Sequence, residues 1–146
     1  MNDAVPLLLA FLLGAMISIY QPMNGLVSRI VGSPIVANVV FYLVGFMASV
    51  VMLMASGGLS HASKLRDAPP LLYLAGIMSA VMVLGTIALL PKLGARRLFL
   101  LQVAGQIVMA MIVAHYGLLG LPHDSLTPRK IAGAVILLAG AIISLG

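Results

Sequence analysis

The sequence predicts an all-α integral membrane protein with five transmembrane helices, on the strength of three observations. Of the 146 residues, 62% are hydrophobic and 8% are charged, whereas a soluble domain has about 25% charged residues. The mean hydropathy is +1.20. The apolar residues form continuous blocks of about 20, which is the length of helix that crosses roughly 30 Å of hydrocarbon, and not the alternating pattern of a barrel strand. Lipid is therefore the expected solvent for most of this surface.

Proline and glycine mark the expected ends of the helices. The first helix has an internal Pro22, where we expect a kink, and ends at the Gly32-Ser33-Pro34 turn. Pro34 begins the second helix, and Pro91 with Gly94 closes the third. The loops are too short for another domain, so residues 1–146 form a single transmembrane domain. The predicted spans are 4–31, 34–55, 71–90, 97–116 and 129–145.

The basic residues are divided equally between the two sides of the predicted membrane domain. With five spans, one side has Lys64, Arg66, Arg129 and Lys130, and the other has Arg29, Lys92, Arg96 and Arg97. Equal numbers give no positive-inside bias, which predicts that the chain inserts in both orientations. Two opposed copies would form an antiparallel homodimer with the inverted symmetry found within many transporters. The alternative is that the chain has one fixed orientation, which is determined by differences in hydrophobicity between the helices.

The net charge of +5 does not predict a nucleic-acid partner. All eight basic residues lie at or near predicted helix ends, where lysine and arginine side chains reach lipid headgroups. The lipid bilayer is therefore the partner that these charges indicate.

Three predicted helices carry stripes of polar and small residues. On the first helix the stripe lies within about 80° of the helical wheel, with Asn24 at its flank, and comprises Ala10, Gly14, Ser18, Gln21, Gly25 and Ser28. Polar groups in hydrocarbon are costly unless they are bonded, so we expect the stripes to face a common interior. There the amides would bind a neutral or zwitterionic solute beside an aromatic wall. The predicted pathway residues are Ser18, Gln21, Asn24, Asn38, Phe41, Tyr42, Gln102 and Gln106.

Other small residues and one proline are assigned to helix packing or bending. They are Gly14, Pro22, Gly25, Gly45, Gly105, Gly133 and Gly140. In the alternative interpretation, the amides of the predicted pathway have the same role as these small residues and serve helix association alone. The chain would then be a non-transporting interaction or assembly subunit. A third possibility is one half of a heterodimeric transporter.

The sequence predicts neither a catalytic site, nor a metal site, nor a cofactor. It contains no Cys and no Glu, and Asp3, Asp67 and Asp124 lie in termini or loops. A carboxylate in mid-membrane, which could exchange a proton for a cation, is therefore not expected. His61 and His123 lie in loops without metal-ligand spacing. An enzyme is not the expected function.

Short motifs along most of the chain resemble a known family. They are Gln21 with Asn24 and Leu26, the Gly32-Ser33-Pro34 turn, Phe41 with Gly45, Pro91-Lys92-Leu93-Gly94-Ala95, Gly105-Gln106, His115-Tyr116-Gly117-Leu118-Leu119-Gly120, and Gly133 with Ala139-Gly140. In order and spacing the chain resembles the YdcZ-like family of small exporters in the drug/metabolite transporter (DMT) superfamily. At Ala114 it departs from the family pattern, which usually has an acidic residue there.

The resemblance implies an architecture and a location. The family has five helices per chain, which is the half-unit of a ten-helix fold completed by a homologous or antiparallel partner. It implies a multi-pass protein of the bacterial inner (cytoplasmic) membrane that transports a small molecule.

Overall fold

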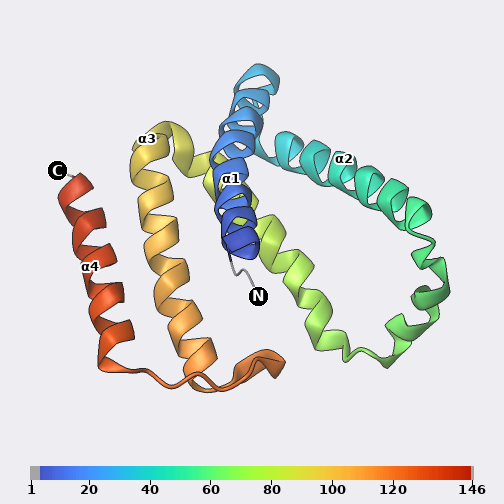
Figure 1. Cartoon of the computed structure of the whole chain (residues 1–146). Coiled ribbons are helices and arrows are strands. Elements are labelled where there is room, and N and C mark those ends of the chain that lie inside the picture. The colour runs from blue at the N-terminus through green and yellow to red at the C-terminus, as the bar shows by residue number, and fades with distance from the viewer. Residues whose placement is uncertain (1–3, 146) are drawn as a thin grey trace. The chain divides into compact units, whose positions relative to one another are not determined.

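Helices make up the regular structure of the part of the chain that the computed structural model describes, residues 4–145 without the side chains of residues 62 and 63. Asp3 lies outside these residues. The α-helices are α1 (Ala4–Val31), α2 (Pro34–Ala55), α3 (Leu74–His115) and α4 (Pro128–Leu145), in the order shown in Figure 1. The 3₁₀-helices are η1 (Gly58–Asp67), η2 (Pro70–Tyr73) and η3 (Leu118–Gly120).

Four helical segments in the described residues are long and apolar enough to cross a membrane. The predicted spans 71–90 and 97–116 both lie within the third of these segments, Pro70–His115. Gly94 interrupts the helical backbone there, with φ 75° and ψ 158°, a conformation that essentially only glycine adopts. The interruption lies between the two predicted spans. The division into five separate spans remains a prediction. It requires the chain to cross the membrane a second time within this segment, after Gly94.

The chain divides into two compact units, Met1–Lys92 and Leu93–Gly146, and each is described by itself. In the first unit, α2 begins at an N-cap that the sequence explains. Ser33 is extended, its Oγ accepts a hydrogen bond of 3.4 Å from the Val36 amide, and Pro34 occupies the first turn. Proline suits this position because it has no N–H that would need a partner.

The first unit has a small apolar core. It consists of Ala37 in α2 with Val83 and Ile87 in α3, and Phe41 and Tyr42 pack against it. α1 approaches α3 closely at a different point, because a Cβ on Gly25 would lie 2.7 Å from Leu90 Cδ2. α1, α2 and the beginning of α3 are therefore packed together.

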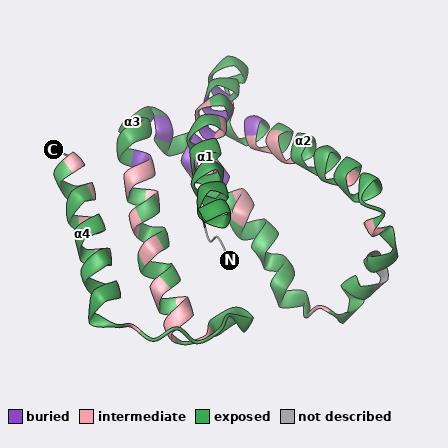
Figure 2. Cartoon of the chain, in the orientation of Figure 1, coloured by how far each residue is buried: buried purple, intermediate pink, exposed green. Residues whose placement is uncertain are grey.

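Most apolar residues of the helices are exposed, and the ribbon in Figure 2 is accordingly green, the colour of exposed residues, over most of its length. Ile30 is 77% exposed and Phe11 is 73% exposed, and both lie on α1. Such extensive apolar exposure is unfavourable in water, but in a bilayer lipid tails cover it. The described residues thus have the surface of a multi-pass membrane protein.

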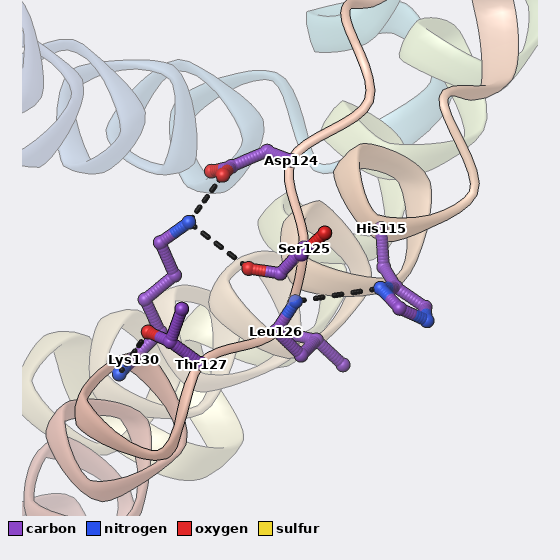
Figure 3. A network of polar contacts seen from close by, with 6 residues as sticks. All are labelled: His115, Asp124, Ser125, Leu126, Thr127 and Lys130. Atoms are coloured by element: carbon purple, nitrogen blue, oxygen red, sulfur yellow. Dashed lines mark hydrogen bonds and ion pairs between the residues drawn. The ribbon is translucent and has the colours of Figure 1, made fainter.

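In the second unit, residues 124–126 of the loop between α3 and α4 bond to both of these helices (Figure 3). The Asp124 amide donates to the Ala114 carbonyl over 2.8 Å, and the Leu126 amide donates to His115 Nδ1 over 3.4 Å. The Lys130 ammonium pairs with the Asp124 carboxylate and donates to the Ser125 carbonyl. The loop therefore joins the end of α3 to the first turn of α4.

Candidate functional site: a polar interior in the first unit

The buried face of α1 is polar. Gln21 is 4% exposed, Asn24 7% and Ser28 8%, and the fourth buried residue of this helix is Gly25. Their spacing of three, four and seven residues places them on one side of the helix. The apolar side chains of α1 lie largely at the exposed positions. This is the reverse of a helix in a water-soluble protein, and it directs the amides towards the interior of the unit.

Two residues of the predicted pathway connect α2 to α3. Asn38 Nδ2 donates to the Ala80 carbonyl oxygen over 3.3 Å, and the Tyr42 hydroxyl lies 2.6 Å from Ser79 Oγ. Asn38 and Tyr42 are one turn apart on α2, and their partners are adjacent on α3. These bonds hold the two helices together, which is the packing role that polar groups often have in membrane helices.

Within the described part of this unit, three buried amide atoms have no hydrogen-bond partner. They are Gln21 Oε1, Asn24 Nδ2 and Asn38 Oδ1. Leaving a buried donor or acceptor unbonded costs about 1–3 kcal/mol. Three such atoms on two neighbouring helices therefore lower the stability of the isolated chain. A bound molecule could form hydrogen bonds with them.

A groove of about 380 Å³ runs between α1 and α2. Its walls are mostly apolar, and Asn24 is part of the lining. The rings of Tyr20 and Phe41 are stacked, with centroids 5.6 Å apart. The lining residues are Tyr20, Met23, Asn24, Val27, Ala37, Val40, Phe41, Val44, Gly45 and Ala48. The groove suits an apolar or aromatic group that reaches an amide at one point.

The remaining predicted pathway residues are not part of this cluster. Ser18 is exposed on α1. Gln102, which is half-buried, and Gln106, which is exposed, belong to the second unit. A common interior formed by the amides of both units stays a prediction.

Among the glycines assigned to packing, only Gly25 has a close neighbour in the described residues. The others have nothing within 4 Å of the position a Cβ would occupy, and they are Gly14, Gly45, Gly105, Gly133 and Gly140. Pro22 lies inside α1, between Gln21 and Asn24. The open glycines leave room for another helix but do not identify one.

Several residues of the interior were not among the predicted pathway residues. Ser79 bonds Tyr42, and Thr86 is 3% exposed and donates to the Met82 carbonyl over 2.9 Å. A spacing of seven residues, which repeats on one helix face, could have identified this pair. The acceptor at Ala80 is a backbone carbonyl, which every residue has, so the sequence could not identify it.

The part of the chain that the structure describes contains no group of three or more His, Cys, Asp or Glu residues that could hold a metal ion. The buried polar side chains of the first unit are the amides of Gln21 and Asn24 and the hydroxyls of Ser28 and Thr86. Together with the exposed apolar helices, they define a multi-pass membrane protein with a polar interior.

The chain belongs to the family described as "Putative inner membrane exporter, YdcZ", whose model matches residues 5–143. The resemblance found in the sequence is thereby confirmed. Comparisons with curated proteins and with solved structures found no match. The family is one of membrane exporters of the DMT type.

Proposed function

We propose that this chain transports a small neutral or zwitterionic molecule across the bacterial inner membrane, as an antiparallel homodimer of dual topology. The amides of the first unit recognise the molecule, and the family assignment supports export as the direction. The single observation that carries this proposal is the set of unbonded buried atoms on Gln21, Asn24 and Asn38.

The unbonded amide atoms distinguish a solute pathway from an interior whose polar groups serve only helix packing. Amides that serve only helix association would bond one another or the backbone, as Asn38 Nδ2 does with Ala80. Gln21 Oε1 and Asn24 Nδ2 have no such partner, although both residues are more than nine-tenths buried. A solute that bonds these atoms would recover the free energy that their burial costs.

Two features support the dimer. The equal division of basic residues favours insertion in both orientations. In α4, Gly133 and Gly140 share a face and have open space around them, and small residues of this kind allow helices of two membrane proteins to approach closely. A second copy in the opposite orientation would also supply the other half of a DMT-type fold.

The Tyr42–Ser79 and Asn38–Ala80 bonds favour a second candidate, a non-transporting assembly subunit. In that case the interior would stabilise the fold without conducting a solute. A heterodimer with a non-identical sister chain is a further alternative, which the equal charge distribution disfavours.

Solute influx into proteoliposomes tests the proposal. Purified protein is reconstituted, and swelling after mixing with isotonic urea, malonamide, erythritol or glycine betaine is followed by light scattering. We expect faster influx of at least one probe than in protein-free liposomes. Gln21→Ala and Asn24→Ala should abolish it while the dimer persists in cross-linking. Wild-type influx in both variants would refute the site, and loss of the dimer in both would favour the assembly subunit.

A further inference from the structure

We infer that the transported molecule carries a urea-type or primary carboxamide group, with two N–H donors beside one carbonyl acceptor. This inference rests on the proposed function and specifies its substrate class. It comes from the buried side-chain atoms that have no partner among the described residues of the first unit, which are two acceptors, Gln21 Oε1 and Asn38 Oδ1, and one donor, Asn24 Nδ2.

The three amides belong to one region of the first unit. Gln21 and Asn24 are three residues apart on the buried face of α1. Asn24 lines the same groove as Ala37, which precedes Asn38 in α2. The bond from Asn38 Nδ2 to the Ala80 carbonyl fixes the amide of Asn38, so that its oxygen is the atom left without a partner.

Other polar groups match this set less well. With the amides of Gln21 and Asn24 in the orientation described, a carboxylate, which only accepts hydrogen bonds, would leave Gln21 Oε1 and Asn38 Oδ1 unbonded. In the same orientation a guanidinium or ammonium group, which only donates, would leave Asn24 Nδ2 unbonded. Either ion would also have to be desolvated in this interior. The described residues of α1, α2 and the beginning of α3 include no acidic side chain to compensate a cation.

The α1–α2 groove provides a route to these amides. Its mostly apolar walls and the stacked rings of Tyr20 and Phe41 suit the remainder of the molecule. The amide atoms are buried, so binding requires α1 to separate locally from α2. Pro22 lies between Gln21 and Asn24 and cannot donate to the Ser18 carbonyl in the preceding turn, so α1 lacks one backbone hydrogen bond at this point.

The test uses solutes that differ in donors and acceptors at similar size. Influx of urea and malonamide into proteoliposomes is compared with that of erythritol and glycine betaine, each after subtraction of the protein-free rate. The wild-type protein should favour urea and malonamide by about tenfold, because one unmet hydrogen bond corresponds to roughly that factor.

The isosteric variant Asn24→Asp gives the sharper comparison, because it replaces the donor with acceptors. It should lose urea influx and gain influx of guanidinium, which has the shape of urea but only donates. Ile19→Ala, at an exposed position on the same helix, is the control and should retain the wild-type preference. Size-exclusion chromatography and circular dichroism establish that Asn24→Asp remains folded. A second variant, Gln21→Met, has a similar length but lacks the acceptor Oε1, and it should lower the preference for urea.

The outcomes distinguish this inference from the proposed function. If erythritol enters as fast as urea in the wild type, the substrate class is wrong although transport stands. An unchanged preference in folded Asn24→Asp and folded Gln21→Met would likewise overturn the inference. If none of the four probes enters faster than through lipid alone, the proposed function fails and the inference fails with it.

Discussion

Gly25 of α1 faces Leu90 of α3 so closely that a Cβ on the glycine would lie 2.7 Å from Leu90 Cδ2. Because Leu90 is 7% exposed, its side chain has little space into which it can move. The contact lies on the same buried helix face as Gln21 and Asn24.

We expect Gly25→Ala to lower the free energy of unfolding in detergent by about 1–2 kcal/mol, because the added methyl overpacks this contact. Thermal unfolding followed by circular dichroism measures the effect. Adding Leu90→Ala should relieve the overpacking, so that the double variant is more stable than the sum of the two single changes predicts. Gly76→Ala in α3 is the control, since nothing lies within 4 Å of its Cβ position. Equal effects of Gly25→Ala and Gly76→Ala would contradict the close contact.

Tyr42→Phe tests the bond between α2 and α3. Its hydroxyl lies 2.6 Å from Ser79 Oγ, and we expect a loss of about 0.5–1.5 kcal/mol in stability, as for other hydrogen bonds between membrane helices. Ser79→Ala should cost a similar amount. The combined variant should cost little more than either one, because each change removes the same bond. Strictly additive losses would show that the two hydroxyls do not interact.

The sequence predicts the helical regions of this fold better than their division into spans. α1 and α2 cover the same residues as the first two predicted helices, because proline and glycine at 32–34 and 57–58 prevent helix continuation. Pro91 together with Gly94 was expected to end the third helix, but the helix continues past Pro91. A proline removes one backbone hydrogen bond without stopping a helix that its neighbours support. The interruption is at Gly94, where the backbone φ is positive.

The polar face of α1 was predictable for a similar reason, since the helical period places Gln21, Asn24 and Ser28 on one side. The partners of Asn38 and Tyr42 were not predictable. Ala80 acts through its carbonyl, which every residue has, and the pairing with Ser79 depends on how α2 and α3 are positioned. Periodicity describes the face of each helix but does not determine which faces meet.

Replacing Gly94 should lower the stability of the protein because of its backbone conformation, and not because of a steric contact. Nothing lies within 4 Å of its Cβ position, but φ 75° with ψ 158° is unfavourable for any residue with a Cβ. We expect Gly94→Ala to reduce stability by about 1–3 kcal/mol, measured by thermal unfolding. Gly85→Ala, at an equally open but helical position of α3, should be neutral or slightly stabilising. If Gly94→Ala behaved like Gly85→Ala, the interruption of α3 would not depend on glycine.

The proposed dual topology can be measured directly because the chain has no cysteine. His61→Cys places a single thiol in η1 without changing the number of lysines and arginines. In intact spheroplasts we expect an impermeant maleimide to label about half of the molecules, because equal numbers of basic residues on the two sides give neither orientation an advantage. The other half should become labelled only after the membrane is permeabilised.

Leu121→Arg adds one positive charge to the loop before α4, which the five-span topology places on the same side as residue 61. The added charge should retain that side in the cytoplasm more often and lower the labelled fraction, whereas Leu121→Gln should leave it unchanged. Complete labelling or complete protection of His61→Cys, unaltered by Leu121→Arg, would establish a fixed orientation and exclude the antiparallel homodimer.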